Sequence, residues 1–405
     1  MKKKKKSKKW LRFRHRVVRR LLWPPFWIYA SLRYHIQIEP FREQEKRPYL
    51  ILLNHQTPFD QFFVGLSFRC PVYYLATEDI FSMGWVSSLI RYLVAPIPIK
   101  KQTTDVKAIL TCLKVVKEGG TIAIAPEGNR TYSGRTEYMN PSIAPLARKL
   151  GLPIALFRIE GGYGAEPRWS DVIRRGKMHA YVSRVIRPEE YADMTDDELF
   201  ALIRDGLYVN EARTDMEFHH KKRAEYLERA AYICPDCGFS PFESRGDTVT
   251  CMTCGKQIRY LPTKELQGVG FDLPFRFFAD WYDYQQRYVN ESDVTALTEQ
   301  PIFRDSAKVS RVIPYERKVP LYADAPVALY GDRITVGEGE QTLTFSFDEV
   351  TAAAVLGRNK LNIYHDGNIY QFKGGKRFNA LKYVHICHRY QNICKGAPDE
   401  QFLGL

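Results

Sequence analysis

One stretch of this chain constrains its fold more than any other: an apolar run, Tyr49–Leu53, followed by residues 54–60, Asn-His-Gln-Thr-Pro-Phe-Asp. The run predicts a buried β-strand. His55 then follows the strand end, and Asp60 stands five residues further on, too far around one helix for the two side chains to share a face. They can meet if His55 lies on a loop and Asp60 in the first turn of the next helix, a placement that Pro58 favours.

Two interpretations of this pair stay open on the stretch alone. His55 and Asp60 suit a general base and the carboxylate that orients it. Alternatively, Asp60 stands three residues after Thr57, as in a capping box, and only stabilises the helix N-terminus. The pattern of the surrounding sequence has to decide between them.

Strands alternate with helices after this stretch. Helices are expected at residues 59–68, 81–94 and 105–117, and strands at residues 71–76, 95–101, 121–125 and 152–159. This alternation predicts an α/β sheet, and open α/β sheets bind ligands at their strand ends. The distinctive residues do lie at strand ends: Lys100 and Lys101, the run Pro126-Glu127-Gly128-Asn129-Arg130, and residues 160–164, Glu-Gly-Gly-Tyr-Gly.

Four motifs in this order resemble those of the glycerolipid acyltransferase superfamily, whose type member is 1-acylglycerol-3-phosphate acyltransferase. Residues 54–60 are similar to its first motif, and residues 126–130 to its Pro-Glu-Gly-Thr-Arg motif. Leu152-Pro153-Ile154 resembles the fourth motif, and residues 97–101 are a weaker match to the second. The resemblance covers roughly residues 20–210 and implies an acyltransferase-type mixed sheet flanked by helices.

The residue types fit acyl transfer without appeal to the family. Neutral His55 can take the proton of an acceptor hydroxyl, and Asp60 can hold the ring and stabilise the imidazolium that forms. The hydroxyl attacks the thioester directly, so no serine or cysteine nucleophile is required. His55 and Asp60 are therefore the candidate catalytic residues.

The candidate substrate-binding residues are three cations and two residues of the turn that precedes Arg130. Arg130, with Lys100 or Lys101, supplies positive charge for an acceptor phosphate. The resemblance, rather than any spacing, implies that Glu127 and Gly128 shape the acceptor pocket. The alternatives are a surface turn with an internal ion pair for Glu127 and Arg130, and a solvated face for the lysines.

Two departures from the family pattern bear on the acceptor. Asn129 stands where the family usually has threonine, and lysines stand where the second motif usually ends in arginine. The reaction type is unaffected by these changes, but the acceptor headgroup stays open between 1-acylglycerol-3-phosphate and a related lysophospholipid.

The first 32 residues carry most of the excess charge. Twelve lysines and arginines and no acid lie in residues 1–20, which leaves the rest of the chain with a net charge of +2. A basic helix from Trp10 to Leu22 and an aromatic run to Leu32, broken by Pro24-Pro25, are too short to cross a bilayer but suit insertion into one leaflet. We expect a membrane anchor at residues 1–32 and a monotopic or peripheral protein on the cytoplasmic face of the membrane; a solvated tail or a signal peptide are the alternatives.

Four of the eight cysteines form two Cys-x-x-Cys pairs separated by thirteen residues. This spacing is typical of a zinc ribbon, in which four thiolates leave no coordination position for a substrate. We therefore expect structural zinc, held in a compartment that keeps thiols reduced. The ligands would be Cys234, Cys237, Cys251 and Cys254.

The chain after the acyltransferase-like region, residues 33–210, predicts three further segments. Residues 211–262 are expected to be a helical connector and the ribbon, and residues 263–319 an aromatic-rich linker or helix. Residues 320–405 show six short strands and a final helix, similar to a pleckstrin-homology-type barrel that binds lipid headgroups or serves as a scaffold.

Together these features predict a membrane-associated O-acyltransferase of phospholipid biosynthesis. It would move a fatty-acyl group from a thioester of coenzyme A or acyl carrier protein to a lysophospholipid hydroxyl, with membrane lipids as partners. The alternatives are a non-catalytic lipid-binding or scaffold protein, and a nucleic-acid-associated protein that uses the basic tail and the ribbon. Because the remainder of the chain is nearly neutral, no nucleic acid is expected as a partner.

Overall fold

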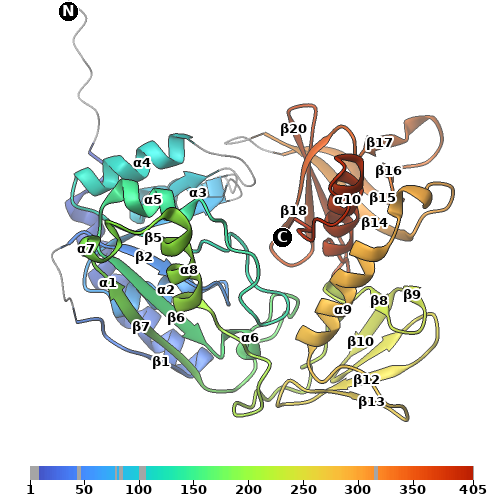
Figure 1. Ribbon diagram of the computed structural model, residues 1–405, viewed down its shortest axis with the longest axis horizontal. Coiled ribbons are helices and arrows are strands. Elements are labelled where there is room, and N and C mark those ends of the chain that lie inside the picture. Colours follow the sequence, from blue (N-terminus) through green and yellow to red (C-terminus); the bar gives the residue numbers. More distant parts are fainter. Residues whose placement is uncertain are drawn as a thin grey trace, which may run out of the picture. The chain divides into compact units, whose positions relative to one another are not determined.

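The computed structural model describes residues 9–42, 47–77, 80–81, 85–99, 106–313 and 318–404. The chain divides into two compact units, and each unit takes in three separate stretches of sequence (Figure 1). Unit 1 comprises residues 1–130, 139–162 and 177–209, and unit 2 comprises residues 131–138, 163–176 and 210–405. The finer division into five segments stays a prediction.

A seven-stranded mixed sheet forms the centre of unit 1, with the strand order β1-β7-β6-β2-β5-β3-β4. Strand β2 pairs in parallel with β5 and β6, whereas β6 and β7 are antiparallel. The expected mixed α/β fold is confirmed, and β1 and β7 are strands that we did not expect. The strands are β1 (Ile36–Ile38), β2 (Leu50–Leu53), β3 (Val72–Thr77), β4 (Ile97–Ile99), β5 (Thr121–Ile124), β6 (Ile154–Glu160) and β7 (Met178–Ile186).

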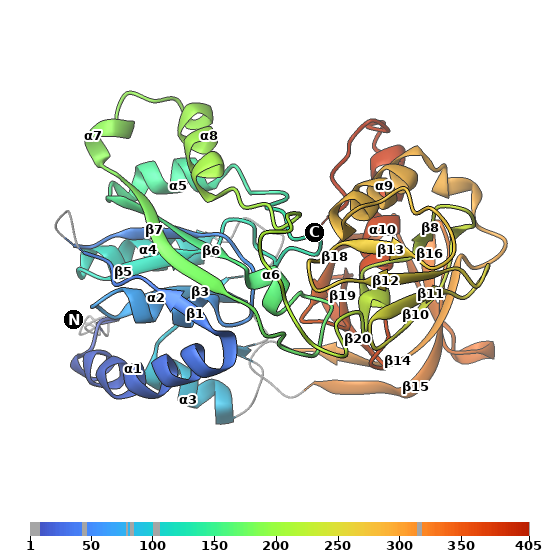
Figure 2. The same ribbon diagram turned by 90° about the horizontal axis from the view of Figure 1, so that it is seen from below.

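Helices cover both faces of this sheet (Figure 2). One layer contains α1 (Phe13–Tyr34), α2 (Asp60–Ser67) and α3 (Trp85–Leu93), and the other contains α4 (Val106–Lys117), α5 (Ile143–Leu150) and α8 (Asp196–Leu207). Alternate side chains of β2 serve the two layers, because Leu50 and Leu52 belong to the core that includes α4, α5 and α8. The short helix α7 (Pro188–Tyr191) links β7 to α8.

Helix α1 is continuous over 22 residues although Pro24 and Pro25 lie inside it. The expected break at these prolines is therefore wrong. Contacts with α2 compensate for the lost backbone hydrogen bonds: the ring of Phe26 stacks on Phe62 at 4.5 Å, and Trp23 Nε1 donates to the Leu66 carbonyl at 3.1 Å. Among the described residues, no helix has both the length and the apolar content needed to cross a bilayer.

The cysteine-containing part of unit 2 is built from short antiparallel strands. A hairpin of β8 (Ile233–Cys234) and β9 (Gly238–Phe239) is followed by a four-stranded sheet and by helix α9 (Phe278–Glu291). The strands of that sheet are β10 (Phe242–Arg245), β11 (Thr248–Cys251), β12 (Gln257–Tyr260) and β13 (Leu266–Gly268). The aromatic-rich stretch thus contains a core helix, since Phe278, Trp281 and Tyr282 are buried.

The rest of unit 2 is a seven-stranded antiparallel sheet, ordered β17-β16-β15-β14-β20-β19-β18, against which α10 (Leu381–Cys394) packs. The expected β-rich C-terminal region with a closing helix is present, with one strand more than expected. That strand, β14, alternates buried Phe303, Ala307 and Val309 with charged residues. The strands are β14 (Phe303–Val312), β15 (Val319–Leu329), β16 (Arg333–Val336), β17 (Leu343–Ser346), β18 (Val350–Leu356), β19 (Lys360–His365) and β20 (Asn368–Gly374).

The expected helical connector at residues 211–232 is wrong. Only Leu227–Arg229 forms a helical turn there, of the 3₁₀ type. The backbone groups of this region bond to distant segments instead: the Phe218 N–H donates to the Pro262 carbonyl at 2.8 Å, and the Ala224 N–H to the Gly246 carbonyl at 2.9 Å. These long-range bonds use groups that a helix would have paired four residues apart.

Candidate active site

His55 and Asp60 meet at the carboxyl end of the central strand β2. His55 lies on the loop after the strand, and Asp60 is the first residue of α2. The distance between His55 Nδ1 and Asp60 Oδ2 is 2.7 Å. The Asp60 side chain is 1% exposed and that of His55 26%, so the carboxylate is removed from water while the ring stays accessible. With Nδ1–H donating to Asp60, Nε2 is the ring nitrogen left to accept a proton.

Asp60 also holds the loop that carries His55. Its carboxylate accepts the N–H of Gln56 at 2.7 Å, the N–H of Thr57 at 2.9 Å and the Thr57 hydroxyl at 2.7 Å. These donors offset the cost of burying a carboxylate. The two interpretations of the sequence are thus compatible, because one carboxylate both orders the helix entrance and contacts the imidazole.

Glu127 reaches the same loop from the neighbouring strand. It follows β5, and its Oε1 accepts the backbone N–H of His55 at 2.7 Å. Its side chain is buried. This contact, which fixes the backbone of the candidate base, is a role that sequence reasoning missed.

Of the remaining predicted binding residues, Gly128 and Arg130 lie on the turn after Glu127. Gly128 is exposed and has a φ of +69°, a conformation that favours glycine, and its N–H donates to the Ala125 carbonyl at 3.0 Å. Arg130 is half-buried at the end of the same turn. Lys100 and Lys101 lie outside the described residues.

Asn54 and Gly162 shape the site although sequence reasoning gave them no role. The Asn54 side chain forms two hydrogen bonds with the backbone of Ile159, both of 2.8 Å, and so ties the end of β2 to β6. A Cβ atom on Gly162 would lie 2.5 Å from Cβ of Gln56, so only glycine fits there. The available signals were the asparagine next to His55 and the two glycines after β6.

A mostly apolar cavity of about 140 Å³ lies beside α2. Its walls come from α1, α2, α3 and the chain around β3, and include Leu22, Phe26, Phe62 and Leu93. His15 and Tyr73 form its polar edge, with Nδ1 2.9 Å from the hydroxyl. Burial lowers the pKa of His15 and raises the pKa of Tyr73 to about 12, so both groups are neutral at pH 7.

The four paired cysteines come together in unit 2. Their sulfur atoms all lie within 4.8 Å of one another, so the group could hold a metal ion. Gly238 and Gly255 follow the two pairs with φ values of +71° and +75°, as tight turns around a metal require. The cluster is Cys234, Cys237, Cys251 and Cys254.

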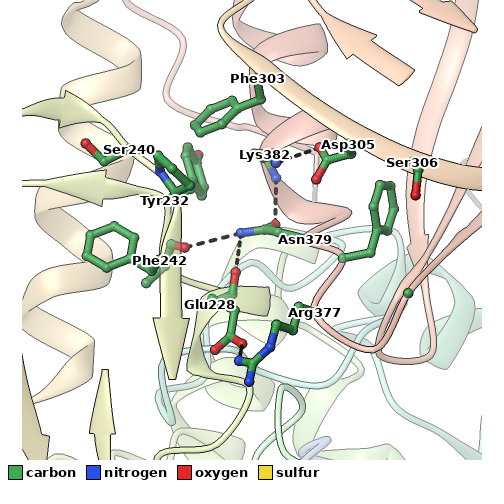
Figure 3. A pocket seen from close by; sticks show the side chains of 14 residues that line it. Glu228, Tyr232, Ser240, Phe242, Phe303, Asp305, Ser306, Arg377, Asn379 and Lys382 are labelled. Carbon is green, nitrogen blue, oxygen red and sulfur yellow. Dashed lines mark hydrogen bonds and ion pairs between the residues drawn. The ribbon is translucent and has the colours of Figure 1, made fainter. Parts of the chain in front are cut away.

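A second cavity, of about 270 Å³, lies in unit 2 (Figure 3). Its charged groups already have partners: Lys382 Nζ lies 2.7 Å from Asp305, and Arg377 pairs with Glu228. Figure 3 shows the Asn379 amide between Glu228 and Lys382, where its Nδ2 donates to the Glu228 carbonyl at 3.0 Å. Because the charges are balanced, this cavity favours no ligand class.

Comparison with known proteins identifies the family that residues 34–159 match. Residues 34–159 match the family model described as Acyltransferase. The matched range contains β2, β5 and the loops that carry His55, Asp60 and Glu127. Residues 34–159 therefore match the acyltransferase family, which confirms the resemblance seen in the motifs.

Two relatives of this chain are both named 1-acyl-sn-glycerol-3-phosphate acyltransferase. The chain is 24% identical over 191 residues to a chloroplastic 1-acyl-sn-glycerol-3-phosphate acyltransferase of Brassica napus, covering 46% of this chain and 54% of that protein. It is 21% identical over 136 residues to the 1-acyl-sn-glycerol-3-phosphate acyltransferase of Bacillus subtilis, covering 34% and 65%. The match thus spans between about half and two thirds of these relatives' lengths. The crystal structure of the Thermotoga maritima 1-acyl-sn-glycerophosphate acyltransferase aligns at 20% identity over 49% of this chain and 80% of that one, with a TM-score of 0.39, too low to establish a shared fold.

Proposed function

We propose that this protein transfers a fatty-acyl group from an acyl thioester to the free hydroxyl of 1-acyl-sn-glycerol-3-phosphate or a related lysophospholipid. The observation that carries the proposal is the His55–Asp60 pair, 2.7 Å apart, inside an acyltransferase-family domain. The names of the relatives support the reaction and the acceptor class.

The pair can perform the reaction as a base and its orienting acid. His55 Nε2 takes the proton of the acceptor hydroxyl while the hydroxyl oxygen attacks the thioester carbonyl. A carbon–oxygen bond forms, the carbon–sulfur bond breaks, and the departing thiolate receives the proton from the imidazolium. Asp60 stabilises the imidazolium between these steps.

The acceptor phosphate requires cations near this pair. Arg130 can bind it through two parallel hydrogen bonds, with Lys100 or Lys101 as a second charge. Glu127 is assigned here to holding the His55 backbone, through the 2.7 Å bond, in addition to the acceptor-pocket role that the resemblance implies. Because Asn129 stands in place of the family's threonine, the acceptor could also be a related lysophospholipid with another headgroup.

The donor is an acyl thioester of coenzyme A or acyl carrier protein. The apolar cavity beside α2 supports a lipid substrate, because it offers a site of about 140 Å³ in which part of an acyl chain is shielded from water. It lies against Gln61, the residue after Asp60.

A membrane surface is the proposed location, on its cytoplasmic side. Helices α1 and α3 expose large apolar side chains that a water-facing surface does not need, and residues 1–20 add positive charge that anionic lipids attract. The most exposed of these side chains are Phe13, Leu21, Leu32 and Trp85.

The four-cysteine cluster is proposed to hold structural zinc. With Zn–S bonds of about 2.3 Å, tetrahedral coordination separates the sulfurs by about 3.8 Å. The observed separations, all within 4.8 Å, reach this with small adjustments, and Cys234 and Cys254 are already 3.9 Å apart. Four thiolates would complete the coordination, so the site would stabilise the fold and take no part in the chemistry.

The proposed reaction is tested by acyl transfer with the purified protein. Wild type, His55→Ala and a control, His219→Ala, are offered thioester donors of several chain lengths with lysophosphatidate, other lysophospholipids or glycerol-3-phosphate. His219 is a suitable control because it is exposed and its ring pairs with Glu217 at 2.9 Å. We expect product with wild type and His219→Ala and none with His55→Ala. No product from any acceptor with either donor class would favour a non-catalytic lipid-binding protein.

A further inference from the structure

We infer that Tyr132 and Arg135 are positioning residues for the acceptor-binding turn, and that unit 2 holds them in place. The inference rests on the function proposed above. Arg130 is the last residue of the first stretch of unit 1, and Thr131 begins the segment 131–138, which belongs to unit 2. The peptide bond between them therefore joins the proposed phosphate-binding arginine to a segment that packs within unit 2.

Tyr132 is the first anchor of this segment. It is 1% exposed and belongs to the hydrophobic core of unit 2. Its ring stacks on that of Tyr282 in α9, with centroids 6.4 Å apart and planes 15° apart. The guanidinium of Arg168 lies over the ring of Tyr132, 4.4 Å from its centroid. The same guanidinium donates to the Val355 carbonyl at 3.1 Å. Tyr132 thus contacts both a helix and an arginine that is itself bonded to a strand.

Arg135 is the second anchor. Its guanidinium donates to the Ala279 carbonyl at 3.2 Å and forms an ion pair with Asp283, and both partners are on α9. The residue before it, Gly134, accepts the N–H of Glu211 at 2.9 Å. Gly134 has a φ of +90°, and a Cβ there would lie 2.6 Å from the ring of Tyr163. The segment is therefore closely packed along its length.

The same core links this segment to the cysteine cluster. It includes Tyr132, Cys234 and Cys251, together with Trp169 from the second segment, 163–176, that unit 2 takes from the middle of the acyltransferase-like sequence. Arg229 fixes that second segment by donating to the Trp169 carbonyl at 2.9 Å and to Asp171 at 2.6 Å. Both segments, residues 131–138 and 163–176, thus pack within unit 2.

Loosening the first segment should affect binding of the acceptor more than the chemistry. Tyr132 is two residues from Arg130, and each residue spans at most about 3.6 Å, so an anchored Tyr132 limits where Arg130 can lie. If the anchor is lost, the backbone of about one residue must be ordered when the acceptor binds. That cost corresponds to a rise of roughly fivefold to thirtyfold in KM for the acceptor. His55 lies on the loop after β2, and Asp60 is the first residue of α2. Glu127, which bonds to the His55 backbone, is three residues further from Tyr132 than Arg130 is. We therefore expect kcat and KM for the donor to change less than about twofold.

The test compares Asp283→Asn and Tyr132→Ala with wild type. Asp283→Asn is the milder change, because it removes only the charge of one of the two α9 partners of Arg135. Asp332→Asn is the matched control, since Asp332 also pairs with an arginine of unit 2, Arg333, at 2.8 Å. We expect the acceptor KM to rise in the first two variants and to stay at the wild-type value in the control.

Hydrogen exchange supplies a readout that does not depend on activity. Peptides covering residues 121–138 should exchange faster in Asp283→Asn and Tyr132→Ala than in wild type or Asp332→Asn. Unchanged exchange at residues 126–130 in both variants, or an unchanged acceptor KM in an active enzyme, would overturn the inference. A wild-type protein without acyl transfer would overturn the proposed function instead, and faster exchange would still support the positioning role.

Discussion

Replacing Asp60 by asparagine tests the proposed catalytic pair most directly. The two Asp60 oxygens accept from His55 Nδ1, from the N–H groups of Gln56 and Thr57, and from the Thr57 hydroxyl. An amide of the same size has one acceptor oxygen and one NH₂ group. Whichever way it turns, about two of the buried donors face the NH₂ group and lose their acceptor.

Two effects of different size follow from this change. At ~1.5 kcal/mol for each lost charge-assisted bond, the free energy of unfolding should fall by about 3 kcal/mol. If the amide NH₂ faces His55, Nδ1 must accept and Nε2 carries the hydrogen, which is the wrong tautomer for a base. The Asp→Asn change in the serine-protease triad lowers kcat by about 10⁴-fold for this reason, and we expect a loss of similar order here.

Steady-state kinetics and thermal unfolding separate the two effects. The kcat of Asp60→Asn is measured at a temperature at which circular dichroism shows the variant to be folded. Asp196→Asn is the matched control, because Asp196 is also the first residue of a helix, α8, but is 52% exposed. The control should change the free energy of unfolding by less than about 1 kcal/mol and leave kcat unaltered. A folded Asp60→Asn protein with kcat within tenfold of wild type would refute the orienting role of Asp60.

Two further predictions concern the metal and the membrane. Metal-replete protein should contain one zinc ion per chain by atomic absorption; Cys251→Ser should lower that content and the melting temperature, and four freely titrating thiols in the native protein would contradict the zinc site. The double variant Leu21→Glu/Trp85→Glu should release the protein from anionic vesicles in a flotation assay, because each side chain is more than two-thirds exposed in wild type. Val269→Glu, at an exposed position of unit 2, is the control, and equal binding by both variants would count against α1 and α3 as the membrane surface.

Sequence patterns predicted five neighbouring strands of the sheet in unit 1, from β6 to β4, and missed the two strands at the opposite end, β1 and β7. Strands β2 and β5 are buried at every position, so they read as continuous apolar runs. Strand β7 mixes buried and exposed positions over Met178–Ile186, and β1 has only three residues. Neither pattern is distinctive enough to identify a strand. The unbroken α1 was missed for another reason: contacts with α2 outweigh the cost of two prolines, and a local pattern does not contain them.

In the candidate site, the contact between residues close in sequence could be predicted, and the contacts between distant residues could not. His55 and Asp60 are five residues apart, so their contact follows from a strand, a loop and a helix start. The contact between Glu127 and His55 joins residues 72 positions apart, and that between Asn54 and Ile159 joins residues 105 apart. Both depend on which strands are neighbours and in what register, which hydrophobic periodicity does not specify.

Loop length is the signal that could have revealed the exchange of segments between the units. Strand β5 ends at Ile124 and α5 begins at Ile143, and β6 ends at Glu160 while β7 begins at Met178. Connections between strands and helices in such sheets usually have about two to six residues, and much longer ones are either functional or lack order. Here the middle of each connection belongs to unit 2, which supplies the partners that order it. Arg130 lies within the first of these connections, so the order of that connection bears on the proposed phosphate ligand. The contacts of Tyr132 and Arg135 with α9 limit that freedom, and this is the role we infer for unit 2 beside the acyltransferase-like residues.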